Sequence, residues 1–155
     1  MASGVTVEVK GLQELGQNLR LLANPIENQK ICQKAVNAGA QVIRKQAQAL
    51  APKSPKAHKL RGKVIPSGTL KKSIYVKAIK RTEFTAEAWV TVRKLAWYAK
   101  FVEFGLVNKN YPVQAFLRPA FDQEKGFALQ ALIKKLTDEI VAQTLRLQIG
   151  RGEYS

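Results

Sequence analysis

The sequence has little of the chemistry on which most enzymes depend. Among 155 residues it contains one histidine, His58, and one cysteine, Cys32, which nearly excludes nucleophile–base pairs and metal sites built on paired cysteines. It also lacks a glycine-rich phosphate loop and a Gly-x-Ser-x-Gly elbow. Closely spaced carboxylates occur only at 122–124 and 138–139, on predicted helix faces where solvated charge is the ordinary explanation. We therefore predict that the chain is not an enzyme and uses no cofactor or metal.

Long apolar runs are missing as well. No stretch approaches the ~18 consecutive apolar residues of a membrane helix, and the N-terminal residues show no basic start followed by an apolar run, so we expect neither a membrane segment nor a signal peptide. Cys32 has no partner for a disulfide within the chain, which agrees with assembly in a reducing cytoplasm. We interpret Cys32 as a small core residue of a helix and His58 as incidental. The length and the 46% apolar fraction fit one domain at 1–149 with a short tail at 150–155.

Acidic residues are absent from a long internal window. Residues 28–82 contain 14 Lys or Arg and no Asp or Glu, so this window carries nearly all of the net charge of +15. Such a block suggests a nucleic acid, an acidic protein surface or an anionic lipid as partner. The bland alternative is a solvated basic face that only aids solubility.

Hydrophobic periodicity predicts an α+β fold. We expect an antiparallel sheet of three to four strands that packs against an Ala-rich helix and a long C-terminal helix. The predicted elements are strands at 5–9, 73–80 and 84–93, helices at 12–22, 25–50, 97–104 and 119–148, and loops at 53–67 and 106–114. The last helix would be roughly 45 Å long, which exceeds the width of a domain of this size. We therefore expect part of it to pack on another subunit, and Gly126 to bend it.

The 53–67 loop is predicted to be an extended basic loop. Pro52, Pro55, Gly62 and Pro66 argue against a regular element, and five basic side chains crowd the segment. A loop of this length in a small domain usually has a function.

The 97–104 helix combines aromatic residues with one carboxylate. Trp97, Phe101 and Phe104 follow helical spacing, and Gly105 is well placed to end the helix. Core packing alone would explain the aromatic residues. Glu103 is unusual among them, because a buried carboxylate needs a partner, and an Arg or Lys of its own chain or of a neighbour is the natural one.

The order of these features resembles a family of tailed-bacteriophage structural proteins. The motifs are AP at 51–52, GTLKKSI at 68–74, YAKFVEFG at 98–105 and FLRPA at 116–120. The chain resembles, over residues 5–136, the gene-product-ten family of the lambdoid HK phages, related to the minor tail protein Z of phage lambda. Two departures stand out: Leu106 replaces the usual Thr after the glycine, and the connection at 53–67 is longer than usual.

The resemblance implies a siphovirus virion protein of the neck or tail, assembled in the cytoplasm of the host bacterium. It implies a homo-oligomeric ring of sixfold or twelvefold symmetry at the head–tail junction, which joins the tail to the DNA-filled head and has no catalytic site. The partners would be adjoining head-closure or connector proteins and tail-terminator or tail-tube proteins, without a membrane. The alternatives are a free basic nucleic-acid-binding protein and, more remotely, a small hydrolase or toxin.

Two sets of residues become candidate contact sites. We expect the first set to build one face of the subunit interface: Trp97, Tyr98, Phe101, Glu103, Phe104, Gly105, Phe116, Leu117, Arg118 and Pro119. The second set, the basic arm, would meet either an acidic surface of a neighbouring ring, which we favour, or the packaged DNA, non-specifically: Lys53, Lys56, Lys59, Arg61, Lys63, Lys71 and Lys72.

Overall fold

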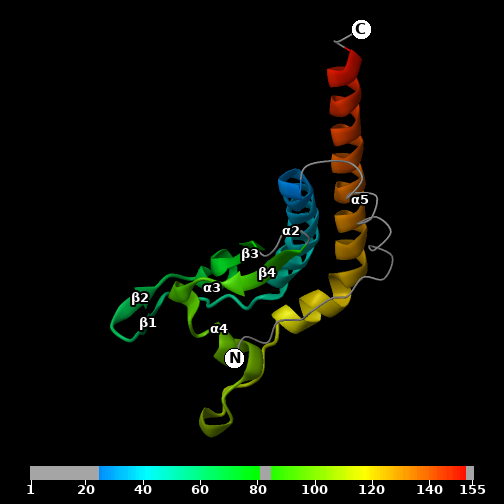
Figure 1. Ribbon diagram of the computed structural model, residues 1–155. Coiled ribbons are helices and arrows are strands. Elements are labelled where there is room, and N and C mark those ends of the chain that lie inside the picture. Colours follow the sequence, from blue (N-terminus) through cyan, green and yellow to red (C-terminus); the bar gives the residue numbers. More distant parts are fainter. Residues whose placement is uncertain (1–24, 81–84, 153–155) are drawn as a thin grey trace.

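The computed structural model describes residues 25–80 and 85–152 and has the predicted α+β fold (Figure 1). Its elements are α2 (Pro25–Leu50), β1 (His58–Leu60), β2 (Lys63–Ile65), α3 (Thr69–Ser73), β3 (Ile74–Lys80), β4 (Ala86–Val92), the 3₁₀ helix η1 (Lys94–Ala96), α4 (Ala99–Phe104), the 3₁₀ helix η2 (Val107–Lys109) and α5 (Leu117–Gly152). The predicted strand at 5–9, the helix at 12–22 and most of the turn at 80–83 lie outside the described residues.

The two long helices, α2 and α5, pack side by side in opposite directions (Figure 1). Lys34 donates a hydrogen bond to Glu139 at 2.8 Å, and Gln46 donates one to Gln123 at 2.7 Å, so positions rise along one helix as they fall along the other. Small residues permit the close approach. A Cβ added to Gly39 would lie 2.8 Å from the carbonyl oxygen of Ala128.

A small apolar core lies between the first half of α2 and α5. It contains Ile31, Ala35 and Leu136, with Cys32 packed at its edge. Burial raises the pKa of the Cys32 thiol. Cys32, predicted to be a small core residue of a helix, lies on α2 and is half-buried at the edge of this core.

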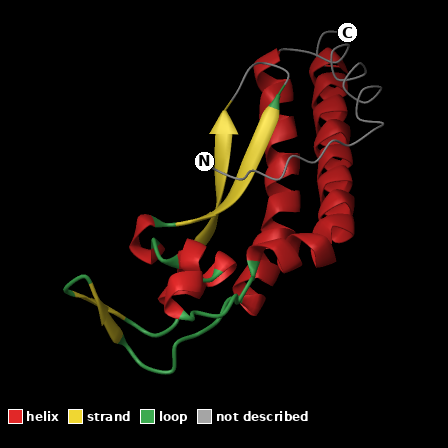
Figure 2. Cartoon of the chain, turned by 90° about the horizontal axis from the view of Figure 1, so that it is seen from below, coloured by secondary structure: helices red, strands yellow, loops and turns green. Residues whose placement is uncertain are grey.

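The β3–β4 hairpin packs on α2, which lies between this hairpin and α5 (Figure 2). The two strands are antiparallel, with Ile74 opposite Val92 and Ala78 opposite Ala88. The expected contact between sheet and helix therefore holds for α2, whereas α5 packs against α2. The described strands form two sheets of two strands each, β1–β2 and β3–β4.

The prediction that residues 53–67 contain no regular element is wrong. This segment contains the antiparallel β1–β2 hairpin, in which His58 lies opposite Ile65 and Lys59 opposite Val64. Arg61 and Gly62 form its two-residue turn, and both have positive φ, 50° and 76°. A tight hairpin turn whose twist matches the strands needs this conformation at both positions. The prolines lie outside the two strands, where they do not remove hydrogen bonds of the ladder.

The C-terminal helix α5 begins at Leu117, two residues before the predicted start, and is 36 residues long. Figure 1 shows that its first turns bend away from the axis of the rest, as Gly126 predicts. The main core lies where this first part of α5 meets the end of α2, α3, the start of β3 and α4. Phe116 and Ile74 are its largest fully buried side chains.

Candidate functional site at the α4–α5 connection

The aromatic residues before and within α4 form a cluster at the surface of the main core. The ring of Trp97 meets the rings of Tyr98 and Phe101 edge-on, with centroids 6.4 and 5.8 Å apart. Trp97 remains 37% exposed and Phe104 57% exposed, whereas Ala99 and Val102 on the other side of the helix are buried. The helix itself begins at Ala99, two residues after the predicted start. Core packing therefore accounts for only part of this cluster.

Glu103 ties α4 to the first turn of α5. The residue is 3% exposed. One carboxylate oxygen, Oε2, accepts hydrogen bonds from the backbone N–H groups of Phe116 and Leu117 at 2.8 and 2.9 Å. The other, Oε1, accepts from the backbone N–H and the side-chain Nε of Arg118 at 3.2 and 3.1 Å. The predicted basic partner of Glu103 is thus Arg118 of the same chain, which also donates from Nη2 to the Glu103 carbonyl.

The Glu103 carboxylate acts as a cap that comes from a distant part of the chain. The first N–H groups of a helix have no partner within the helix and carry a partial positive charge, so an anion there is favourable. Burial raises the pKa of Glu103, but the hydrogen bonds from Leu117, Phe116 and Arg118 outweigh this effect and hold the pKa below its ordinary value of 4.5. The carboxylate therefore stays ionised at neutral pH.

Gly105 ends α4 as predicted, and its geometry requires glycine. Its φ is +72°, and its N–H donates to the carbonyl of Phe101 at 2.8 Å. A Cβ at this position would lie 2.9 Å from the carbonyl oxygen of Tyr111 and 3.0 Å from a methyl carbon of Val113. The backbone at residues 111–113, where the loop returns, therefore packs directly on the end of α4.

The loop after Gly105 is held closed at its base. The N–H groups of Leu106 and Tyr111 each donate to the other residue's carbonyl, at 3.1 and 3.2 Å. Further along, the N–H of Gln114 donates to the carbonyl of Val102 at 2.9 Å. Leu106 thus starts a short closed loop with η2 at its tip.

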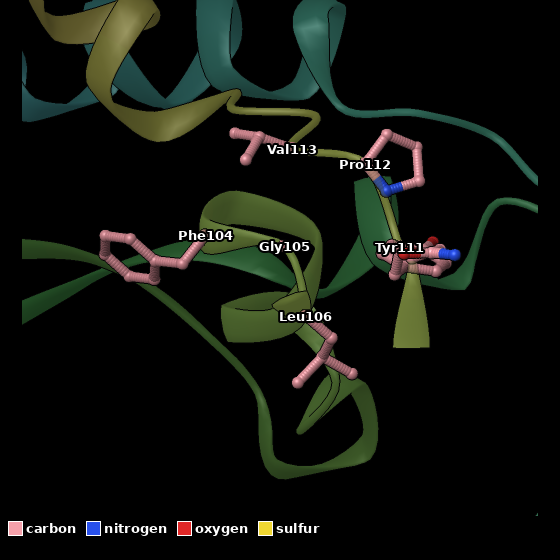
Figure 3. Close-up of a pocket in the computed structure, with 7 residues that line it drawn as sticks. Phe104, Gly105, Leu106, Tyr111, Pro112 and Val113 are labelled. Atoms are coloured by element: carbon pink, nitrogen blue, oxygen red, sulfur yellow. The ribbon is translucent and has the colours of Figure 1, made fainter. Parts of the chain in front are cut away.

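A shallow, mostly apolar hollow of about 400 Å³ lies between the end of α4 and this loop (Figure 3). Seven residues line it: Phe104, Gly105, Leu106, Asn110, Tyr111, Pro112 and Val113. Only the first two are among the predicted interface residues, because 106–114 is predicted to be a loop that connects two helices. The signal that could have found the others is the apolar run Tyr111-Pro112-Val113 inside that loop.

The candidate interface residues divide into a buried and a surface group. Phe116 is fully buried and Glu103 nearly so, whereas Leu117 and Pro119 are half-buried. Phe104, Trp97 and Arg118 are exposed, and the Arg118 guanidinium lies 5.0 Å from the centroid of the Phe104 ring. The structure therefore brings these residues together as one unit. The hydrogen bonds from residues 116–118 to the Glu103 carboxylate, here called the lock, are largely buried, whereas Phe104 and Trp97 leave a partly apolar surface exposed.

The β1–β2 hairpin is seated on the same aromatic cluster. The Arg61 guanidinium lies 4.3 Å from the centroid of the Trp97 ring, a cation–π distance. The His58 ring meets the Tyr98 ring edge-on at 6.1 Å, so His58 has a packing role. Within the part of the chain that the structure describes, no group of three His, Cys, Asp or Glu residues could hold a metal ion.

The basic arm is mostly solvent-exposed. Lys53, Lys56, Lys59, Arg61, Lys63 and Lys72 are exposed, whereas Lys71 is half-buried and donates to the carbonyl of Ala49 at 3.3 Å. Among the described residues, no carboxylate forms a salt bridge with any member of the arm. The arm thus presents cations at fixed positions.

Comparisons with known proteins identify the family. The model of the family described as "Bacteriophage HK97-gp10, putative tail-component" matches residues 13–105, which is more than half of the chain. The matched segment extends from before α2 to Gly105 and includes both hairpins, α4 and Glu103. No curated protein and no solved structure matches the chain. None of the described helices is both long and apolar enough to span a membrane. The chain belongs to the HK97-gp10-like family of bacteriophage tail components.

Proposed function

We propose that the chain is a structural virion protein without catalytic activity that forms a ring at the head–tail junction and joins the tail to the DNA-filled head. Membership of a phage tail-component family supports a place in the virion and contacts with other virion proteins. The ring would be of sixfold or twelvefold symmetry, and each subunit would contact the next head-to-tail, because only a heterologous contact can close a ring of many copies.

The observation that carries this proposal is the exposed Phe104 ring beside an open apolar hollow. Aromatic residues are enriched at the cores of protein interfaces, where they fill pockets on the partner. Phe104 follows Glu103 in α4, and its ring lies 5.0 Å from the guanidinium of Arg118, which is hydrogen-bonded to Glu103. The position of the ring is therefore fixed before a neighbour arrives. A surface held rigid in this way loses little conformational entropy when a second subunit binds.

The long helix α5 supports a second contact between subunits. Several large apolar side chains on it are exposed, at intervals along the helix: Phe127, Ile133, Val141, Leu145 and Ile149. A helix with apolar residues on its exposed side gains free energy when a partner covers them. This distribution favours the expectation that part of α5 packs on another subunit of the assembly.

The first test is where the chain lies in the particle. Antibody-gold labelling of intact virions of the phage that encodes this chain, and of separated heads and tails, should mark the head–tail junction. Label elsewhere on the tail would refute the proposed location at the head–tail junction. No label on any particle, with the protein free in the lysate, would refute the structural role.

The second test is the contact surface. Phe104→Ser should leave the protein folded but yield heads and tails that do not join. Leu95→Ser is a matched control, because Leu95 on η1 is also 57% exposed, and it should leave the yield of joined particles unchanged. Normal joining with the Phe104 variant would contradict the proposed contact.

A further inference from the structure

The end of the molecule built from the β1–β2 hairpin, α3, η1 and α4 carries charge of one sign. Residues 51–73 and 93–117 contain 11 Lys or Arg and a single carboxylate, Glu103. That carboxylate is buried and already accepts four hydrogen bonds. Clustered like charges repel one another and gain free energy when an oppositely charged surface approaches. The composition of this end therefore favours an anionic partner.

The hairpin holds part of this charge in a defined arrangement. His58, Leu60 and Ile65 share one face of the β1–β2 ribbon and are buried or half-buried. Lys59 and Val64 lie opposite each other on the other face, and both are exposed, Val64 to 61%. The outward face thus combines the cation Lys59 with the apolar side chain of Val64. Lys63 follows the turn and pairs with Leu60, so it belongs to the other face of the ribbon, but its side chain is also exposed.

We propose that this outward face of the hairpin docks on an acidic surface of a neighbouring virion protein, with an apolar depression that receives Val64. The inference rests on the proposed function, because the partner is another component of the same particle. Lys59 on this face, with the exposed Lys63 at the turn end of the ribbon, gives attraction and orientation, and burial of Val64 adds the apolar contact that a specific protein interface requires.

Two other partners fit the hairpin less well. Single-stranded nucleic acid needs free aromatic faces for stacking, but Arg61 covers the Trp97 ring, and the same ring packs edge-on against Phe101. Duplex DNA would take the lysines but offers no site for Val64, since binding there is mainly to phosphates.

A second copy of the chain also fits poorly. Its exposed carboxylates on α5, Asp122 and Asp138, have Lys125 and Lys134 at helical spacings of three and four residues, and such neighbours reduce the negative charge that a partner meets. Glu139 is already paired with two lysines.

The test is zero-length carbodiimide coupling on purified virions, followed by mass spectrometry. This reagent joins a lysine amine only to a carboxylate in contact with it. We expect Lys59 or Lys63 to be joined to Asp or Glu of a different virion protein. Coupling to a carboxylate of this chain, or no coupling at either lysine, would overturn the proposal. Formaldehyde links from the same lysines to DNA, without protein links, would assign the arm to DNA instead.

Variants in the same phage make the test quantitative. Lys59→Glu with Lys63→Glu should reduce the yield of joined particles at least tenfold, and reversing the coupled carboxylate of the partner to Lys should restore it. Lys45→Glu, at an exposed position of α2 in the same acid-free window, is the matched control and should have no effect. If the chain is present at the junction but the double variant joins normally, only the docking is refuted. If the chain is absent from the particle, the proposed function and the docking are both refuted.

Discussion

Replacement of Glu103 by Ala tests whether the α4–α5 lock stabilises the fold. The substitution leaves the N–H of Phe116 without an acceptor in a buried place, which costs about 2 kcal/mol. The N–H groups of Leu117 and Arg118 are only partly buried, and water replaces part of their lost hydrogen bonds, so each adds about 0.5–1 kcal/mol. The expected loss in the free energy of unfolding is therefore about 3–4 kcal/mol, within the range for removing one partner of a buried ion pair.

Two further substitutions separate the cap from the ion pair. Glu103→Gln keeps the shape, but its amide NH₂ faces N–H donors at one of the two oxygen positions, so we expect a loss of about 2 kcal/mol. Arg118→Ala removes a side chain that is 57% exposed, and solvent screening limits the expected loss to about 1 kcal/mol. The loss of stability should thus be largest for Glu103→Ala, smaller for Glu103→Gln and smallest for Arg118→Ala.

The assay is urea unfolding of the purified protein, followed by tryptophan fluorescence, since the Trp97 ring packs against Phe101 of α4. Asp138→Asn is the control, because Asp138 is an exposed carboxylate of α5 and its substitution should change stability by less than about 0.5 kcal/mol. A loss below about 1 kcal/mol for Glu103→Ala, or a loss equal to that of the control, would refute the account of Glu103 as a cap.

Three further predictions follow from the packing and the pKa shifts. Because folding lowers the pKa of Glu103, its contribution is present above the unfolded value near 4.5 and is lost as the pH falls through the folded value. The stability gap between the wild-type protein and Glu103→Gln, measured by urea unfolding between pH 7 and about pH 3, should therefore shrink in acid, and a constant gap would contradict this. Gly39→Ala should destabilise by about 1–3 kcal/mol, since its Cβ meets Ala128 on α5, whereas Gly126→Ala, with open space, should stabilise by about 0.5–1 kcal/mol; equal effects in thermal unfolding would refute the close helix contact. Phe116→Ala should cost about 3–5 kcal/mol in the same assay because the side chain is fully buried, and a loss below about 1 kcal/mol would contradict its place in the core.

Sequence reasoning worked best where structure follows from local periodicity. The predicted helix at 25–50 has the bounds of α2, and the strand predicted at 73–80 differs from β3 by one residue. A helix with apolar and small residues on one side, followed by a proline, is specified almost entirely by its own residues. The α+β class followed from these elements.

The hairpin at 58–65 was missed because its signal is short and charged. Each strand has only three residues, and lysine is a poor strand former, so no alternation was visible. Its stability comes from contacts with residues more than 30 positions away, such as Arg61 with Trp97. Gly62 was counted as a residue that breaks structure, whereas here it completes a turn that joins two strands.

For Glu103, the sequence predicts one kind of partner and not the other. The sequence showed that a carboxylate among aromatic residues needs a partner, and Arg118 is that partner. The three backbone donors could not be seen, because main-chain N–H groups are the same in every sequence and become a site only when α5 starts beside α4. The hollow at the end of α4 was missed for a related reason, since it exists only after the loop closes on Gly105.

The segment that matches the family model contains only one side of the lock. The matched segment ends at Gly105 and contains the acceptor, Glu103, whereas all four donors lie after it, at residues 116–118. A buried carboxylate without donors is strongly unfavourable, so α4 in this conformation depends on the start of α5. The FLRPA motif supplies those donors, and Pro119 lies in the first turn of α5, where a residue without an N–H is tolerated. The two motifs of the sequence analysis, YAKFVEFG and FLRPA, are therefore two halves of one structural device, and the exposed surface of Phe104 is positioned by both.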